Sequence, residues 1–306
     1  MSILSRPWVA AAVARAMQRG VVATSRRMVS TANARLPEFT ARRESTEVPT
    51  SAGMTRVTLY HPPAATGAVH INLHGGGYVL PLTEYDDPIC RALAARSGSV
   101  VLNVDYVVAP QHPFPAAVHQ VHEVARWAAE HGAEHGWDGQ RLTIGGQSAG
   151  GALAAAAARL AFEQGHPAFA LQVLHYPPLD LSIPAASKRS TIRKPMLRPW
   201  MGDVFDTSYA PDPAVRSDRL ISPAGAADTA DLAGIAPAVV IAAEHDILRD
   251  EARRYADRLE RVGALVEYRE LTGADHGYDG VDDERARESY AFIADHIRRA
   301  VETPKP

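Results

Sequence analysis

The sequence has little that could cross-link the chain or carry it across a bilayer. Its 306 residues include one cysteine, Cys90, so an intrachain disulfide is impossible. No apolar run reaches the roughly 18 residues that a membrane-spanning helix needs. The formal net charge is −3, which gives no overall attraction to nucleic acid. We therefore expect no integral membrane segment and no nucleic-acid partner, and the lone cysteine fits a reducing compartment.

Lysine is also scarce, since only 3 of the 32 basic residues are lysine and the rest are arginine. Arginine, alanine, glycine and proline share GC-rich codons, so this bias indicates genome composition. We predict a cytoplasmic protein of bacterial origin. Hydrophobic residues make up 46% of the chain and charged residues 22%, values close to globular averages. This composition excludes a disordered chain, a collagen-like chain and a coiled coil.

The N-terminal segment has a charge pattern of its own. Residues 1–43 hold eight arginines and one acidic residue, an Arg-rich start that resembles an organelle transit peptide. A bacterium has no organelle to which such a peptide could direct the protein. A secretory signal is also excluded, because Arg15 and Arg19 interrupt the apolar core that it would need. Apolar residues at helical spacing across 8–29 instead predict an amphipathic helix, whose arginines could alternatively meet an acidic surface or a membrane. The polar stretch 30–50 is predicted to be a linker.

Beyond residue 53, short apolar runs alternate with helical stretches. The runs predict strands at 54–60, 68–74, 99–106, 141–146, 170–176, 237–246 and 264–271. The stretches between them predict helices at 85–97, 115–131, 149–163, 248–262 and 283–301. Strands that alternate with helices form βαβ units, so we predict an α/β fold with a mostly parallel central sheet and helices on both faces.

Residues 181–223 break this rhythm, because they contain six prolines and no clear strand. A loop of this length inside a compact domain is usually a lid or an insertion, so we predict a cap over the carboxyl ends of the strands. Apolar and aromatic side chains suit a substrate pocket. We expect such a pocket to be lined by Tyr78, Met196, Trp200, Met201 and Phe205, with Trp8 as a further candidate and plain core packing as the alternative.

A nucleophile motif follows the strand predicted at 141–146. Gly146-Gln147-Ser148-Ala149-Gly150 matches G-x-S-x-G and opens a predicted helix, which is the strand–turn–helix setting of a nucleophile elbow. Gly146 and Gly150 lack a Cβ, so the strand and the helix can approach each other closely. The alternative is a glycine-rich connector that holds an ordinary serine.

A run of glycines, His74-Gly75-Gly76-Gly77, follows the strand predicted at 68–74. Consecutive glycines let backbone N–H groups turn toward a ligand, and such donors stabilise a tetrahedral oxyanion. A phosphate-binding loop is the alternative, but neither its Lys-Ser/Thr pair nor its GxGxxG pattern is present. We expect His74 to hold the loop through hydrogen bonds and not to act as a base.

The acid and the base should follow the serine in that order along the chain. His276 lies in a Gly-containing loop after the last predicted strand, whereas His296 is expected on the surface of the C-terminal helix. Asp246 ends the strand predicted at 237–246 and is our candidate acid, with Asp180 as the runner-up. Asp275 adjoins the histidine, which makes the usual bridge to Nδ1 awkward. The alternative role for Asp246 is that of a helix N-cap.

Five segments together resemble the hormone-sensitive-lipase family of α/β-hydrolases, in its bacterial esterase branch. They occur in the family's order, from about Thr58 to the C-terminus, as HGGGYV (74–79), DYVVAPQHPFPAA (105–117), GGQSAGG (145–151), EHDILRDE (244–251) and DHGY (275–278). The resemblance implies a triad of Ser148, Asp246 and His276. It also implies an oxyanion hole formed by the N–H groups of Gly76, Gly77 and Ala149.

The chain departs from the family pattern at three positions. The family usually has Asp where this chain has Gln147, and its usual Arg and Glu are Val107 and Gln111 here. These changes put the charge network around the site in doubt, but not the triad.

The resemblance also implies how the chain is divided. In the family, N-terminal helices and a later insertion together form the cap. We therefore predict cap helices in 1–45, the first part of the catalytic domain in 46–180, the cap insertion in 181–223 and the second part of the catalytic domain in 224–306.

The function implied is that of a serine carboxylesterase acting on short- to medium-chain esters through an acyl-enzyme. Its partner would be a small-molecule ester, with neither a metal nor another cofactor, and a homodimer is left open. Two alternatives remain: a related hydrolase that cleaves an amide, a lactone or a carbamate, and a non-catalytic ligand receptor on the same fold.

Overall fold

Eight strands form one sheet in a computed structural model that describes residues 2–302. Their order across the sheet is β1-β2-β4-β3-β5-β6-β7-β8. The strands are β1 (Arg42–Thr50), β2 (Gly53–His61), β3 (Val69–Leu73), β4 (Val100–Val104), β5 (Leu142–Gln147), β6 (Leu171–His175), β7 (Ala238–Ala243) and β8 (Leu265–Leu271). β1 and β2 run antiparallel to their neighbours, whereas β3 to β8 pair in parallel. The predicted α/β class with a mostly parallel sheet is confirmed.

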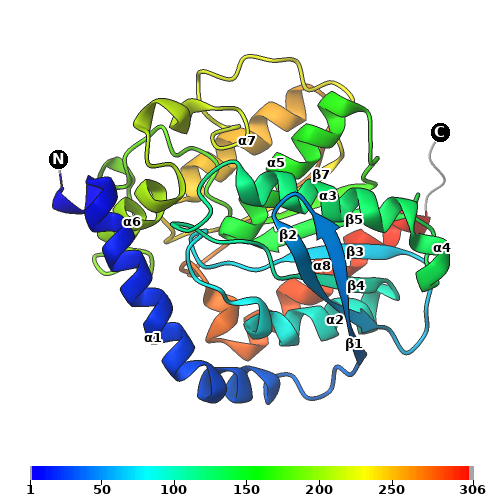
Figure 1. Cartoon of the computed structure of the whole chain (residues 1–306). Helices are drawn as coiled ribbons and strands as arrows, with labels where there is room; N and C mark the ends of the chain where they lie inside the picture. The colour runs from blue at the N-terminus through cyan, green and yellow to red at the C-terminus, as the bar shows by residue number, and fades with distance from the viewer. Residues whose placement is uncertain (1, 303–306) are drawn as a thin grey trace.

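Helices cover both faces of this sheet (Figure 1). α2 (Asp87–Ser97) and α8 (Asp283–Glu302) pack on one face. The other face is covered by α3 (Ala116–Glu130), α5 (Ala149–Gln164) and α7 (Arg249–Arg261). Successive side chains of β4 point to opposite faces of the sheet. Val100 and Leu102 pack in the apolar cluster with α3 and α5, whereas Val101 packs in the cluster with α2 and α8. The short helical elements are α4 (Gly132–His135) and the 3-10 turns Ile3–Ser5, Thr83–Asp86, Ala185–Ser187, Pro213–Ser217 and Tyr278–Gly280.

The segment 42–50, predicted as part of a linker, instead forms the edge strand β1. It pairs with β2 along its whole length in a hairpin. Only Val48 has a fully buried side chain, because both faces of this edge are largely open to solvent. The strand therefore lacks the apolar alternation that marks a half-buried strand, and its pairing comes from β2.

The N-terminal helix α1 (Pro7–Asn33) runs along one side of the molecule, where it packs against α6 (Pro199–Tyr209) of the 181–223 segment (Figure 1). Pro7 at its first position fits the usual helix start. Gln18 fixes the helix to the body, since its Nε2 donates to the carbonyls of Val79 and Ala109 at 2.9 and 3.0 Å. Within residues 2–302, no helix combines the length and the apolar character that crossing a membrane requires.

Candidate active site

Ser148 sits at a sharp turn between β5 and α5. Its φ of 52° and ψ of −122° lie in a region that non-glycine residues rarely adopt. The turn is held by a hydrogen bond from the Ser148 N–H to the carbonyl of His175 at 2.8 Å. The hydroxyl thereby projects from the carboxyl end of the sheet into a cavity.

The glycines of the motif make room for this turn. A Cβ on either Gly146 or Gly150 would overlap the carbonyl oxygen of Leu73, at the end of β3. The elbow and the neighbouring strand are therefore in direct backbone contact, which only glycine permits at these two positions.

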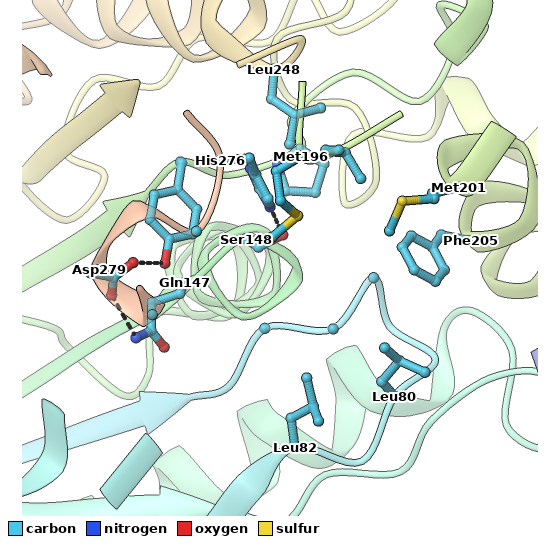
Figure 2. A pocket seen from close by; sticks show the side chains of 18 of the residues that line it. Leu80, Leu82, Gln147, Ser148, Met196, Met201, Phe205, Leu248, His276 and Asp279 are labelled. Carbon is cyan, nitrogen blue, oxygen red and sulfur yellow. Dashed lines mark hydrogen bonds between the residues drawn. The ribbon is translucent and has the colours of Figure 1, made fainter. Parts of the chain in front are cut away.

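Three side chains from three loops form one hydrogen-bonded line, and Figure 2 shows its Ser148–His276 part. His276 Nε2 lies 2.9 Å from Ser148 Oγ, and His276 Nδ1 lies 2.6 Å from Asp246 Oδ2. The other oxygen of Asp246 accepts the N–H of Leu248 at 3.0 Å, just before α7. The carboxylate thus contacts Leu248, the N-cap residue of α7, and faces the imidazole as well. Asp246 is therefore not the N-cap of this helix, which was its alternative role.

The electrostatics of His276 favour a base with one defined tautomer. Burial lowers its pKa, but the carboxylates of Asp246, Asp275 and Asp279, with Asp246 foremost, together outweigh burial and raise the pKa above the ordinary value. Because a carboxylate only accepts, the neutral ring carries its proton on Nδ1. The lone pair on Nε2 then faces the serine hydroxyl.

The other candidate acids have different partners. Asp180 pairs with Arg254 at 2.8 Å. Asp275 accepts the backbone N–H of His276 at 2.8 Å and that of Met196 at 2.6 Å, so it ties the 181–223 segment to the histidine loop.

His296 is not on the surface as expected. Only 6% of the residue is exposed, and its Nε2 lies 3.2 Å from Glu267. The flanking charges Asp295 and Arg298 suggested a solvated position, but His296 lies on the inner side of α8, which packs on the sheet.

The glycine loop passes close to the nucleophile. Gly76 and Gly77 have φ angles of 112° and 61°, and both line the cavity with Ser148. Their N–H groups donate to no residue in the described part of the chain. The N–H of Ala149, in the first turn of α5, has no partner within its own helix. The geometry thus offers three backbone donors beside the serine.

His74 anchors this loop from behind. Its ring stacks on Tyr106 at 4.1 Å, its Nδ1 lies 2.6 Å from the Gly75 carbonyl, and its own carbonyl accepts the Tyr106 hydroxyl at 2.7 Å. Burial lowers the pKa of His74 to about 4, so its ring is neutral at pH 7. These are the contacts of a residue that shapes the loop.

A cavity of about 300 Å³ opens in front of the triad. Of the predicted pocket residues, Tyr78, Met196, Met201 and Phe205 line it. Trp200 does not, and it is 45% exposed. Met201 and Phe205 are four residues apart and share the inner face of α6, whereas Trp200 is rotated away by about 100°. The prediction for Trp200 is therefore wrong.

Trp8 does not line the cavity either, since it is exposed on α1. No group of three or more His, Cys, Asp or Glu side chains within residues 2–302 is placed to hold a metal ion.

Asp279 is a pocket residue that the sequence did not reveal. Its carboxylate accepts the hydroxyls of Tyr176 at 2.6 Å and Tyr290 at 2.9 Å, and the Nε2 of Gln147 lies 3.5 Å away (Figure 2). Its carbonyl accepts Arg35 at 2.7 Å. Asp279 directly follows the DHGY motif, and Gln147 departs from the family pattern. These two features could have pointed to the pair, but the residues are 132 positions apart in sequence.

Gln111, which stands where the family usually has Glu, hydrogen-bonds to a residue of α1. The Gln111 Nε2 donates to the side chain of Gln18 at 2.8 Å, and Gln18 donates back at 3.1 Å. Val107 packs at the margin of the core. A pair of neutral amides therefore links α1 to the DYVVAPQHP segment.

Known proteins share this architecture. Residues 70–279 match the family described as the α/β-hydrolase fold. The carboxylesterase NlhH of Mycobacterium tuberculosis is 36% identical over 226 residues, which cover 72% of this chain and 70% of that protein. The ethyl acetate hydrolase of Pseudomonas putida is 36% identical over 227 residues, with the same coverage.

Solved structures agree along nearly the whole chain. The esterase of Pyrobaculum calidifontis superposes with a TM-score of 0.84 at 31% identity and covers 94% of this chain and 92% of its own. A thermostable carboxylesterase from a metagenomic library gives 0.85 at 31% identity, with 95% and 98% covered. The matched segments bear out the predicted family: the chain belongs to the hormone-sensitive-lipase family of α/β-hydrolases.

Proposed function

We propose that this protein is a serine carboxylesterase that hydrolyses short- to medium-chain esters through an acyl-enzyme. The observation that carries the proposal is the hydrogen-bonded line from Asp246 through His276 to Ser148, which ends at a cavity edged by glycine N–H groups. Ester hydrolysis is also the activity in the names of the relatives, a carboxylesterase and an ethyl acetate hydrolase.

In the first half of the reaction, Ser148 Oγ attacks the ester carbonyl carbon while His276 Nε2 takes its proton. The carbonyl oxygen becomes an oxyanion, which accepts from the N–H groups of Gly76, Gly77 and Ala149. Asp246 holds the ring and stabilises the imidazolium.

The second half restores the enzyme. The imidazolium gives its proton to the alcohol oxygen as the C–O bond breaks, which leaves the acyl group on Ser148. Water then attacks the acyl carbon while His276 takes a proton from it, and the same proton returns to Ser148 as the acid departs. No step needs a metal or an organic cofactor.

The cap is part of the proposal. Residues 1–45 and 181–223 would form it, with 46–180 and 224–306 as the two parts of the catalytic domain. Two contacts support this division: α1 packs on α6, and Met201 and Phe205 of α6 line the cavity. A volume of about 300 Å³ is at the small end of ligand pockets, which supports short to medium acyl chains.

The cytoplasmic location and the lack of a nucleic-acid partner also belong to this proposal, whereas the homodimer stays open. The single, buried cysteine supports the location, and the net charge of −3 supports the lack of a nucleic-acid partner. Cell fractionation and light scattering of the purified protein test location and oligomeric state.

The test is a series of p-nitrophenyl esters from acetate to palmitate, with Ser148→Ala as the control. Activity should peak at a short or medium chain, and Ser148→Ala should lower kcat by about 10⁴-fold or more. A peak at palmitate would refute the chain-length proposal, and a fully active Ser148→Ala variant would refute the nucleophile. Matched amides, lactones and carbamates test the alternative hydrolases, and binding without turnover would favour the receptor.

A further inference from the structure

The cavity has two unlike walls. One wall is apolar and is formed by Met196, Leu197, Met201, Phe205, Ile247 and Leu248. The other wall carries polar side chains, namely Tyr85, Asp86, Gln147, Tyr176, Asp279 and Tyr290.

Gln147 lines the cavity and carries an acceptor without a partner among the described residues. The Asp279 carboxylate accepts from Tyr176 and Tyr290 and can only accept again, so the amide NH₂ of Gln147 must face it. The Oε1 atom then points away from Asp279, as Figure 2 shows. Gln147 is 8% exposed, and its buried Oε1 receives no hydrogen bond from any residue in 2–302.

A second polar group of this wall is also unpaired. The Tyr85 hydroxyl is buried and has no hydrogen-bond partner within the described residues. A hydroxyl both donates and accepts, so it can serve a ligand group of either kind. Buried polar groups are rarely left unsatisfied, which makes two in one cavity wall a feature that calls for a ligand.

The carboxyls of the wall are poor partners for a cation. Asp279 is already engaged by three donors. Burial raises the pKa of Asp86 to about 7, so this group is partly protonated at neutral pH, and it also accepts from Asn72 at 2.7 Å. The wall therefore suits a neutral hydrogen-bonding group better than an ammonium.

We propose that this wall is a subsite for a hydroxyl group on one arm of the ester, with Gln147 Oε1 as the acceptor of its proton and Tyr85 as the second polar partner. The inference rests on the proposed function and narrows its substrates to hydroxyl-bearing esters. An alkyl arm in the same place would leave both protein groups unpaired, and sites of this kind reject the analogue that lacks the polar group.

The experiment compares esters in which a hydroxyl replaces a terminal methyl. For the alcohol arm the pair is 4-hydroxybutyl butyrate and pentyl butyrate, and for the acyl arm it is methyl 6-hydroxyhexanoate and methyl heptanoate. The readout is the ratio of kcat/KM for the hydroxyl member to that for the methyl member. Gln147→Met keeps the size of the side chain and removes its acceptor, Tyr85→Phe removes a single oxygen, and Gln140→Met on the exposed surface is the matched control.

In the native protein the ratio should be one or more in at least one pair. In that pair it should fall about tenfold in Gln147→Met, the size expected for one buried hydrogen bond, and also fall in Tyr85→Phe, while Gln140→Met leaves it unchanged. A ratio well below one in both pairs, or one that neither Gln147→Met nor Tyr85→Phe alters, would overturn the subsite alone. Failure to hydrolyse any of the four esters would overturn the proposed function and the subsite with it.

Discussion

In the proposed mechanism the protonation state of His276 controls the reaction, and two opposing effects act on the pKa of this residue. Burial lowers its pKa, and the carboxylate of Asp246 at 2.6 Å, helped by those of Asp275 and Asp279, raises it by more, so the pKa lies above 6.5. The reaction needs the neutral ring. We therefore expect kcat/KM to be low in acid and to rise with pH through a midpoint above 6.5. A pH series with p-nitrophenyl butyrate measures the midpoint, and a value below 6.5 would contradict this account.

Asp246→Asn provides the control for that profile. Without this carboxylate, burial is opposed only by the more distant charges of Asp275 and Asp279, so the midpoint should move down while kcat drops by about 10⁴-fold. Asp250→Asn, an exposed aspartate four residues further along, should change neither quantity. An unchanged midpoint in Asp246→Asn would mean that another group sets the pKa of His276.

Single residues also show where sequence reasoning stops. The hydrogen-bonded arrangement of Ser148, Asp246 and His276 could be predicted because each residue stands in a short motif near the end of a strand, and the fold brings strand ends together. Asp279 and Gln18 could not, because their importance lies in partners far away in sequence. The prediction that Trp200 lines the pocket was wrong, because composition reveals an apolar cluster but not which of its side chains points inward.

At the level of secondary-structure elements, the contact between α5 and β3 depends on glycine. Gly150→Ala places a Cβ on the Leu73 carbonyl oxygen, so we expect a loss of about 3 kcal/mol in the free energy of unfolding or a failure to fold. Gly20→Ala in α1, where a Cβ meets nothing, should instead stabilise by about 0.5–1 kcal/mol. Urea unfolding measures both. A Gly150→Ala variant as stable as the native protein would show that α5 can shift away from β3.

The role of α1 is tested by removing residues 2–33. The deletion should stop there, because Leu36 and Phe39 are buried in the core. We expect α6 to lose its support, so that KM rises several-fold and the chain-length preference flattens. Val22→Ser, on an exposed part of α1, is the control. Unchanged chain-length selectivity after the deletion would exclude α1 from the cap.

Elements differed in how well the sequence predicted them. Apolar runs predicted the buried strands, and the helical periodicity of apolar residues predicted the amphipathic helices, whereas no such pattern predicted β1. An edge strand that faces water on both sides has no pattern to show, and its existence depends on the β2 hairpin partner.

For the whole molecule, Cys90 is a natural probe of unfolding. It is 0% exposed in α2, and burial raises its pKa, so neither access nor ionisation favours its reaction. We expect a thiol reagent to leave the native protein unlabelled and to modify one thiol per chain in denaturant. Reducing agent should leave Tm unchanged. Rapid labelling under native conditions would mean that α2 opens locally.

The bonds of Arg35 join the two ends of the chain at the pocket. This residue, just after α1, donates to Asp283 and to the carbonyls of Asp279 and Gly280. A chain leaving the ribosome carries the nucleophile elbow long before it carries His276 or this wall of the pocket. In the proposed mechanism, hydrolysis therefore requires that His276 and residues 279–283 have been synthesised and have packed against Ser148 and Arg35.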